Sequence, residues 1–274
     1  MNENYIYIEN VKCYAPELAR VNDYFSEEYL HHLYKLEDSN FWYRSRNRVI
    51  KNLLNKHLGN STSKSFLEIG CGNGFILKGL MEFENYKLVG ADIHIQGLKY
   101  AKERLPDVEF IQLDATRMPF ENEYDAIGAF DVLEHIDDDI AVIKNVHKAL
   151  KRDGTFIVSV PQYQWMWSHM DDIDQHKRRY SRKELKNKLM ENGFEVTYLS
   201  SFVFFLFPLM AISRFLKKNQ KFQDRSFEEK LTELNLSPLL NFSFETIMRL
   251  DELLINMGLS LPFGGSLIAI GRKI

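Results

Sequence analysis

Short apolar runs alternate along this chain with segments of helical periodicity. Each run ends in small or polar residues and is followed by a stretch in which apolar positions recur every three or four residues. This alternation predicts an α/β fold in which a parallel sheet carries helices on both faces. The predicted strands are 66–69, 87–91, 108–113, 124–130 and 155–160, with further candidates at 194–199 and 267–271.

Two stretches outside this alternation are predicted to be helical. Residues 26–57 show helical spacing with many aromatic and basic side chains, and the polar segment 59–65 ends that pattern. More than sixty residues separate the last two strand candidates, which is too many for an unstructured loop in a compact domain. We therefore predict an N-terminal helical segment, 1–62, and a main domain, 63–274, with a helical insertion or cap at about 201–264.

Composition and charge narrow the class of protein. Of 274 residues, 45% are hydrophobic and 27% are charged, which is typical of a globular protein. The net charge of −3 gives no overall basic surface for nucleic acid. The only cysteines, Cys13 and Cys71, predict neither a disulfide framework nor a zinc site, and the start MNENYIYIEN contains no secretion signal. We therefore expect a cytoplasmic location.

The segment 66–74, FLEIGCGNG, joins the first predicted strand to a helix through three alternate glycines. Glycine permits backbone dihedrals that are closed to other residues and lets a ligand approach the backbone closely. The spacing G-x-G-x-G differs from the G-x-G-x-x-G of dinucleotide-binding folds, and the lysine of a phosphate-binding loop is missing. The turn therefore indicates a nucleotide-like ligand without a pyrophosphate, and tight packing of strand on helix is the alternative.

Polar residues stand where the predicted strands end, at the edge where ligands bind in open parallel sheets. Glu68 ends the first strand, and Asp92, placed to accept hydrogen bonds from a ribose diol, ends the second. Asp114 ends the third and could accept from an adenine amine, and Asp131 follows the fourth. A single such acid is as easily a helix cap or turn residue, but four in this order favour a binding site.

With these motifs the segment from about 66 to 161 resembles the class I S-adenosylmethionine-dependent methyltransferases, whose first motif has the LEIGCGNG form. The resemblance implies a Rossmann-like sheet of seven strands, mostly parallel with an antiparallel last strand. In this chain 267–271 would be that strand, paired with 194–199 across the insertion.

The resemblance also implies the residues that bind S-adenosylmethionine. Its methionine part would lie against Gly70, Cys71, Gly72 and Phe130, its amino group near Glu68, its ribose hydroxyls on Asp92, and its adenine against Ile93, Asp114 and Ala115.

The segment 41–46, FWYRSR, is similar to a helix that leads into methyltransferases linked with glycan and secondary-metabolite pathways. This similarity implies that Trp42, Arg44 or Arg46 closes over the cofactor, with an arginine paired to its carboxylate. The alternative is a helix with an aromatic core face and a solvated basic face.

Methyl transfer from a sulfonium requires mainly alignment of the nucleophile and exclusion of water. A hydroxyl acceptor also benefits from proton removal, and His135 is our candidate general base, which favours oxygen over nitrogen or carbon as the accepting atom. Alternatively His135 braces the turn after the strand.

Asp131, Glu134 and His135 also resemble an ExxEH metal-binding segment of some quinone-pathway and small-RNA methyltransferases, completed here by His169 or His176. Because this mixed donor set is not selective, we predict a site without metal.

Two further segments are candidates for contact with the acceptor or a partner. His176, Arg178, Arg179 and Tyr180 could hold an anionic or sugar-bearing acceptor, and the same residues could also be a basic turn before a helix capped by Ser181 and Glu184.

The apolar tract 202–216 is too short for a membrane span. It is predicted to be buried in the cap or in a dimer contact. With Arg214, Lys217 and Lys218 it could instead form an interfacial helix, a peripheral membrane contact through 202–218.

Together these observations predict methyl transfer from S-adenosylmethionine to a small-molecule or glycan- or lipid-linked acceptor. Two alternatives stand beside this hypothesis. One is a cofactor-binding regulatory protein without catalysis, because fold does not determine function. The other is a nicotinamide-dependent Rossmann oxidoreductase, which the glycine spacing disfavours.

Overall fold

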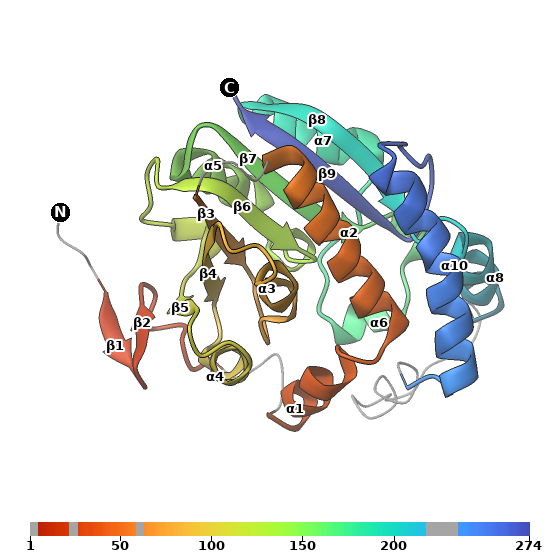
Figure 1. Cartoon of the computed structure of the whole chain (residues 1–274), viewed down its shortest axis with the longest axis horizontal. Coiled ribbons are helices and arrows are strands. Elements are labelled where there is room, and N and C mark those ends of the chain that lie inside the picture. The colour runs from red at the N-terminus through yellow and green to blue at the C-terminus, as the bar shows by residue number, and fades with distance from the viewer. Residues whose placement is uncertain (1–4, 22–26, 59–62, 218–234) are drawn as a thin grey trace.

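A mixed β-sheet with helices on both faces forms the body of the protein (Figure 1). The computed structural model describes residues 5–21, 27–58, 63–217 and 235–274. The described strands are β1 (Ile6–Ile8), β2 (Val11–Cys13), β3 (Lys64–Ile69), β4 (Tyr86–Asp92), β5 (Glu109–Gln112), β6 (Tyr124–Phe130), β7 (Leu150–Pro161), β8 (Phe194–Phe202) and β9 (Ser266–Lys273). The described α-helices are α1 (Glu27–Leu36), α2 (Phe41–Leu58), α3 (Phe75–Leu80), α4 (Ile95–Arg104), α5 (Asp139–Ala149), α6 (His169–Ile173), α7 (Arg182–Glu191), α8 (Phe207–Lys217) and α10 (Pro238–Asn256).

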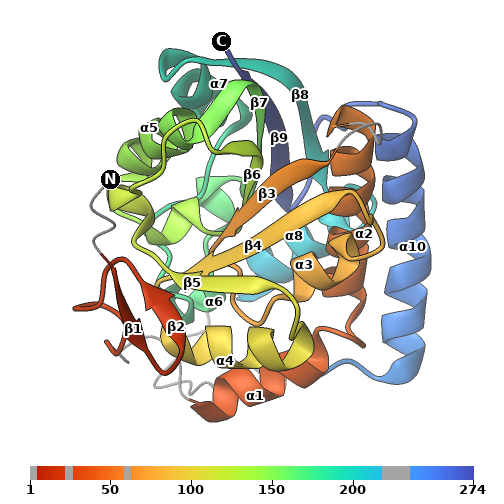
Figure 2. The same ribbon diagram turned by 60° about the vertical axis from the view of Figure 1, so that its left-hand side comes forward.

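The sheet confirms the seven predicted strands and adds two. Its strand order is β1-β2-β5-β4-β3-β6-β7-β9-β8, and β9 runs antiparallel to both of its neighbours, as predicted for the last strand. The prediction of seven strands in all was wrong, because the hairpin β1–β2 extends the sheet through parallel pairing of β2 with β5 (Figure 2). Strands of three residues are too short to carry a readable alternation.

Alternate residues of the central strands point into two separate cores. Leu67 and Ile69 of β3 pack with α5 and α7 on one face, whereas Phe66 packs with α2, α3, α4 and α10 on the other. This two-sided burial explains why the strands are continuous apolar runs rather than alternating ones. It also leaves the polar residues at the carboxyl ends of the strands as the lining of one edge of the sheet.

The predicted helical stretch 26–57 consists of two helices, α1 and α2, in the described residues; Ser26 lies outside them. The chain turns between them because Ser39 donates back to the carbonyl of Leu36, while the side chain of Asn40 accepts from the backbone N–H of Trp42 at 2.9 Å. This turn sets the direction of α2 and with it the position of the predicted cofactor-contacting segment.

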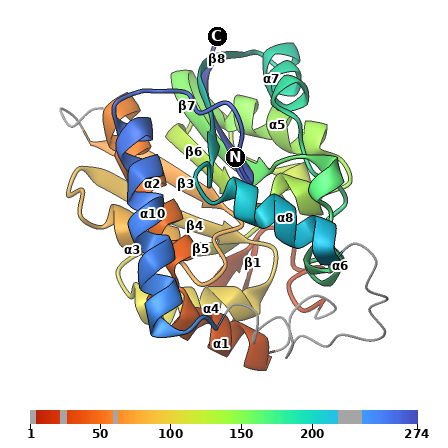
Figure 3. The ribbon, with the colours of Figure 1, turned by 90° about the vertical axis from the view of Figure 1, so that its right-hand side faces the viewer.

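Helices α8 and α10 are the described parts of the predicted insertion, and Lys218 lies outside the described residues. Helix α10 lies along α2 (Figure 3). The guanidinium of Arg48 on α2 pairs with Glu252 at 2.7 Å and with Glu245 at 3.0 Å, so the two helices are held by a largely buried ion-pair network. None of the described helices is long and apolar enough to cross a bilayer.

Candidate functional site

The glycine turn after β3 is held in an unusual backbone conformation. Gly70, Gly72 and Gly74 have φ angles of 66°, 49° and 73°, in the left-handed region that favours glycine. A Cβ added at Gly70 would lie 2.4 Å from Cγ2 of Val132, whereas one added at Gly72 would meet nothing within 4 Å. Gly70 is therefore required for packing, and Gly72 faces open space.

Asp92 at the end of β4 ties this turn to the neighbouring strand. One carboxylate oxygen accepts from the backbone N–H of Gly72 at 2.9 Å, and the other accepts from that of His94, also at 2.9 Å. These bonds hold the carboxylate beside the turn, as predicted from the strand endings. Its remaining acceptor capacity is available to hydroxyl donors in the adjoining cavity.

A cavity of about 630 Å³ extends from the glycine turn across the carboxyl ends of the strands. It is lined by residues from β3, β4, β6 and α2 together with residues of the segment after β7 and of the insertion. The predicted site residues that line it are Trp42, Arg46, Glu68, Gly70, Cys71, Gly72, Asp92, Phe130, His135, His176 and Arg179.

Three predicted cofactor-binding residues besides Arg44 are not among the residues that line this cavity. Asp114 caps the 3₁₀ turn Ala115–Arg117 by accepting from the N–H of Thr116 at 2.9 Å, and its other oxygen accepts from Arg117. The carbonyl of Ile93 accepts from the side chain of Gln112. Ala115 itself is buried in the core, so the adenine contacts remain predictions.

Arg44 and Arg46 are separated by the geometry of α2. Two residues along a helix differ in direction by about 200°, so the two side chains leave opposite sides. Arg44 pairs with Glu245 of α10 at 3.1 Å, whereas Arg46 pairs with Asp131 and stacks 4.5 Å from the ring of Trp42. Of the two arginines, only Arg46 lines the cavity.

The predicted acceptor segment is also divided. Arg179 lines the cavity, but Tyr180 is completely buried and its hydroxyl donates to Asp139 at 2.7 Å. Arg178 pairs with the same carboxylate at 3.2 Å. The structure therefore places Tyr180 and Arg178 in the packing of α5 against the loop before α7, whose predicted cap is confirmed by the bond from Glu184 N–H to Ser181.

Replacing Tyr180 by phenylalanine is expected to lower the free energy of unfolding by about 2 kcal/mol, because one buried hydrogen bond to a carboxylate is lost. Chemical denaturation measures this change. Cofactor affinity and methyl acceptor turnover should be unchanged. Reduced turnover at unchanged stability would instead support the acceptor role predicted from the sequence.

Burial perturbs the ionisable groups beside the glycine turn. Desolvation raises the pKa of Glu68 well above its ordinary value, and the nearby Arg46 opposes this rise. Oε2 of Glu68 has no hydrogen-bond partner within the described chain. Burial also raises the pKa of the Cys71 thiol, which stays protonated. A buried carboxyl oxygen without a described partner, in a residue that lines the cavity beside an open glycine, is consistent with a ligand that carries an amino group.

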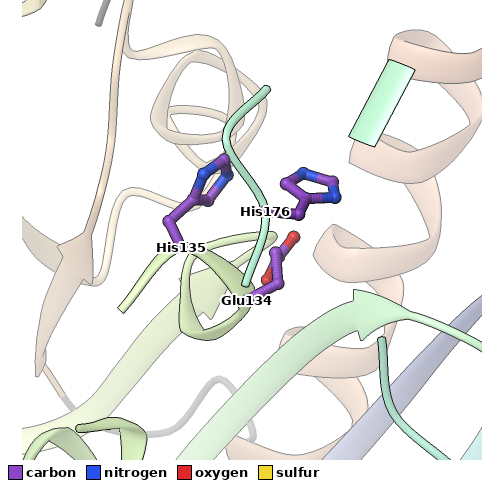
Figure 4. Close-up of side chains that lie close together, drawn as sticks. All are labelled: Glu134, His135 and His176. Carbon is purple, nitrogen blue, oxygen red and sulfur yellow. The ribbon is translucent and has the colours of Figure 1, made fainter. Parts of the chain in front are cut away.

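A second polar group that lines the cavity consists of Glu134, His135 and His176 (Figure 4). The rings of His135 and His176 are 4.7 Å apart, and Asp171 bonds Nδ1 of His176 at 2.9 Å. Desolvation, and then the neighbouring His176, lower the pKa of His135 to about 4. Its imidazole is therefore neutral near pH 7 but is a weak proton acceptor.

The structure separates Asp131 and His169 from this group. Asp131 has a φ of 56°, pairs with Arg46 and accepts from Ser159 at 3.3 Å, so both its oxygens are engaged. The group of possible ligand atoms within the described residues contains neither Asp131 nor His169. Of the residues in the metal-binding alternative, the structure thus brings Glu134, His135 and His176 together and leaves Asp131 and His169 outside the group.

The sequence interpretation missed the apolar wall of the cavity. Leu206, Leu209 and Met210 form it from α8 and the residue before it, Phe244 forms it from α10, and the charged Arg214 of α8 lines the cavity beside them. The positions 206, 209, 210 and 214 follow the spacing of one helix face, which is the signal that could have identified them.

The comparisons with known proteins agree with this architecture. A family model described as "Methyltransferase domain" matches residues 41–199, more than half of the chain. The chain therefore belongs to this methyltransferase family, which confirms the resemblance found at 66–161.

The relatives that match share about one residue in four with this chain. A probable S-adenosylmethionine-dependent methyltransferase of Mycobacterium tuberculosis is 25% identical over 58% of this chain and 57% of its own length. Cycloartenol-C-24-methyltransferase of Arabidopsis thaliana is 26% identical over 59% of each chain, and a ubiquinone biosynthesis O-methyltransferase of Idiomarina loihiensis is 27% identical over 41% of this chain and 49% of its own. The match thus spans less than two thirds of these relatives.

Solved structures share the fold at low identity. Phosphoethanolamine N-methyltransferase 2 of Haemonchus contortus, in complex with S-adenosyl-L-methionine, superposes with a TM-score of 0.60 at 15% identity, over 94% of this chain and 59% of that one. A putative methyltransferase of Bacillus halodurans gives a TM-score of 0.51 at 16% identity, over 82% and 98%.

Proposed function

We propose that this protein transfers a methyl group from S-adenosylmethionine to an oxygen of a small, lipid-type acceptor. The observation that carries the proposal is the single cavity that connects the glycine turn with the apolar wall of α8 and α10. The family membership supports the cofactor, and the relatives named as a cycloartenol-C-24-methyltransferase and a ubiquinone biosynthesis O-methyltransferase support the acceptor class.

The cofactor would lie along the glycine turn and beside Asp92. Asp92 would accept from the ribose hydroxyls, the backbone of Gly70, Cys71 and Gly72 would face the methionine part, and Glu68 would lie near the amino group. Arg46 would pair with the carboxylate by leaving Asp131, and Phe130 and Trp42 would cover the site. When bound, the cofactor supplies a methyl group activated by its positive sulfur.

The protein's part in the reaction would be to align the acceptor with the methyl group and to exclude water from the site. The wall formed by Leu206, Met210 and Phe244 would hold the apolar body of the acceptor and exclude water. His135 would contact the hydroxyl on the opposite side, where its neutral imidazole can accept a hydrogen bond. The positions of His176 and Arg179 also fit a polar head group on the acceptor. The proposed class of acceptors therefore includes lipid-linked glycans.

The exposed apolar side chains of helix α8 support the proposal that the acceptor enters the cavity from a membrane surface. Leu209 lines the cavity and is also 52% exposed, and Ile212, Phe215 and Leu216 continue this exposed apolar surface. Arg214 adds a positive charge beside it. Such a helix is suited to lie at the interface of an anionic bilayer.

The turnover experiment decides between the candidate functions. The protein is incubated with S-adenosylmethionine and either the lipid or the aqueous fraction of a cell extract, and S-adenosylhomocysteine and methylated products are read by mass spectrometry. Turnover with the lipid fraction is expected, and turnover with the aqueous fraction alone would favour a glycan-type acceptor. Cofactor binding without turnover would indicate a regulatory protein, and binding of a nicotinamide dinucleotide instead would indicate an oxidoreductase.

The membrane contact predicts that Phe215→Glu abolishes co-flotation with vesicles that contain phosphatidylglycerol, because a charge on the exposed face opposes insertion. Met190→Glu is the matched control, since Met190 of α7 is 52% exposed on another surface. Equal flotation of both variants and the parent protein, or no flotation of the parent protein, would contradict the contact.

A further inference from the structure

Helix α10, which lies at the surface of the molecule, is apolar on two opposite sides (Figure 3). Met248 and Ile255 are completely buried in the core that this helix shares with α2. On the opposite side, apolar residues at helical spacing are 49–75% exposed, and they form what we call the outer face of α10: Leu239, Phe242, Leu250, Leu253 and Met257. At 3.6 residues per turn these side chains fall within a sector of about 80°. A helix that is apolar all round is normally buried, so the outer face is suited to be covered.

The polar groups of α10 leave its outer face without charge. The charged residues of the helix are Glu245, Arg249, Asp251 and Glu252. Asp251 and Glu252 are buried, and Arg249, at the flank, pairs with Glu252 at 3.5 Å. Within the outer face the hydroxyls of Ser243 and Thr246 donate to backbone carbonyls four positions earlier, at 2.8 and 2.9 Å. Between residues 238 and 257, all of which the structure describes, this face therefore presents neither an ionised group nor a hydroxyl without a partner.

The flank of α10 argues against a bilayer as the occupant of this face. Membrane-surface helices are rich in Lys and Arg on their polar side, where they meet anionic lipid. On α10 that position is taken by Glu245 and Glu252. Their partners are Arg44 and Arg48 of α2 and Arg249 of α10 itself. An apolar strip bordered by paired charges of both signs matches the core and the polar rim of a protein–protein interface.

We infer that this protein forms a symmetric dimer in which the outer faces of two α10 helices pack antiparallel. The apolar side chains are spread almost evenly about residue 248, so a two-fold axis at that level brings each half of the face against the other half on the second copy. The pairs that meet across the axis are Leu239 with Met257, Phe242 with Leu253 and Thr246 with Leu250. The small Thr246 opposite the larger Leu250 lets the two helices interdigitate at the centre.

Antiparallel packing is favoured over parallel packing by the two flanks of α10. One flank carries Glu245, Arg249 and Glu252, whereas Leu240 and Leu254 lie on the opposite flank. A two-fold axis perpendicular to the helices sets like flanks side by side, so that Arg249 of one copy comes to the level of Glu245 of the other. An axis parallel to the helices would set the charges against the leucines, which desolvates them without a partner.

The exposed area is sufficient for a weak dimer. A large apolar side chain offers on the order of 100 Å², and Leu240 and Leu259 extend the outer face at about half exposure. The seven side chains together present roughly 400 Å², which corresponds to about 600 Å² per copy in an interface that is about 65% apolar. Two copies would bury about 1,200 Å², the lower end of the range of specific interfaces. We therefore expect dimerisation that depends on protein concentration.

Sedimentation equilibrium of the full chain tests the dimer. The parent protein is expected to convert from the mass of one chain to that of two as its concentration rises. Leu253→Glu and Phe242→Glu should each raise the dissociation constant at least about 100-fold, because the symmetric interface buries the new carboxylate twice. Met190→Glu on α7 is the matched control and should leave the constant unchanged. Thermal unfolding of each variant shows that it is folded.

Cross-linking tests the antiparallel direction. In the double variant Leu239→Cys/Met257→Cys the two introduced thiols of one chain are about 27 Å apart, so a short bismaleimide can join them only between copies. Covalent dimers are expected from this variant. Leu239→Cys alone should give none, because residue 239 of one copy lies about as far from residue 239 of the other. Cys13 and Cys71 are buried, so the parent protein sets the background.

Four results would speak against the inference. A parent protein that remains a single chain at every concentration, or equal association of the parent and both glutamate variants, would overturn the dimer. Cross-linking of Leu239→Cys alone as efficiently as the double variant would overturn the antiparallel arrangement. Loss of vesicle flotation in Leu253→Glu, with the parent protein a single chain, would assign the outer face to a bilayer instead. These readouts use no methyl acceptor, so they do not depend on the proposed function.

Discussion

Replacing Asp92 by alanine is expected to weaken the binding of S-adenosylmethionine about 100-fold. The variant loses the acceptor proposed for the ribose hydroxyls, and hydrogen bonds to a charged group are each worth about 1.5–3 kcal/mol. It also loses the bonds that hold the N–H groups of Gly72 and His94, so the turn itself is less well positioned. Isothermal titration calorimetry measures the affinity.

Asp125→Ala is the matched control for this experiment. Asp125 also belongs to a central strand, but it lies at the opposite end, where it pairs with Lys151 and accepts from the N–H of Ser65. Its removal should leave the cofactor affinity unchanged. Unchanged affinity in Asp92→Ala would remove the proposed ribose contact, whereas equal losses in both variants would indicate a general effect on folding.

Gly70→Ala is expected to lower the free energy of unfolding by about 2–5 kcal/mol. A left-handed backbone costs alanine about 1–2 kcal/mol, and the added Cβ would lie 2.4 Å from Val132, which forces overpacking worth about 1–3 kcal/mol. Thermal and chemical denaturation measure the loss. This variant tests the packing role of the turn separately from its ligand.

Gly72→Ala separates the two contributions. Its φ of 49° imposes a similar backbone cost, but its Cβ meets nothing within 4 Å and points into open space. Gly72→Ala should therefore be more stable than Gly70→Ala by the free energy of overpacking, about 1–3 kcal/mol. Its affinity for the cofactor should fall, because the added methyl group would occupy space in which we propose that the cofactor binds. If the double variant Gly70→Ala/Val132→Ala is no more stable than Gly70→Ala, the steric explanation is wrong.

The gathering of the proposed cofactor residues at one edge of the sheet was predictable because its signals are local. The glycine turn and Asp92 stand at the ends of adjacent strands, and parallel strands bring such ends together whatever the rest of the chain does. The same logic leaves Asp114 undecided, because its carboxylate also accepts from Thr116 and Arg117 as a helix cap. An acid at a strand end can either bind a ligand or cap the following helix, and the hydrogen-bond donors around it decide which of the two it does.

The acceptor side depends on contacts between distant segments. The sequence shows that 176–180 is basic and aromatic, but only the tertiary structure shows that Tyr180 donates to Asp139, 41 positions away. Likewise the apolar tract 202–216 gives helical spacing without showing which face meets the cavity. The β1–β2 hairpin was missed because each of its strands has only three residues, too few to show an alternating pattern.

The pairing of β8 with β9 means that the insertion between them can be exchanged without disturbing the sheet. Phe202, where β8 ends, is paired with Ser266, where β9 begins, so the two ends of the intervening segment are held as neighbours by the sheet itself. A longer or shorter segment between such fixed ends changes the closure entropy only slightly. Chimeras that exchange 203–265 should therefore retain the cofactor turn and acquire a different acceptor, provided that the new segment covers the face of α2 that Met248 and Ile255 now bury.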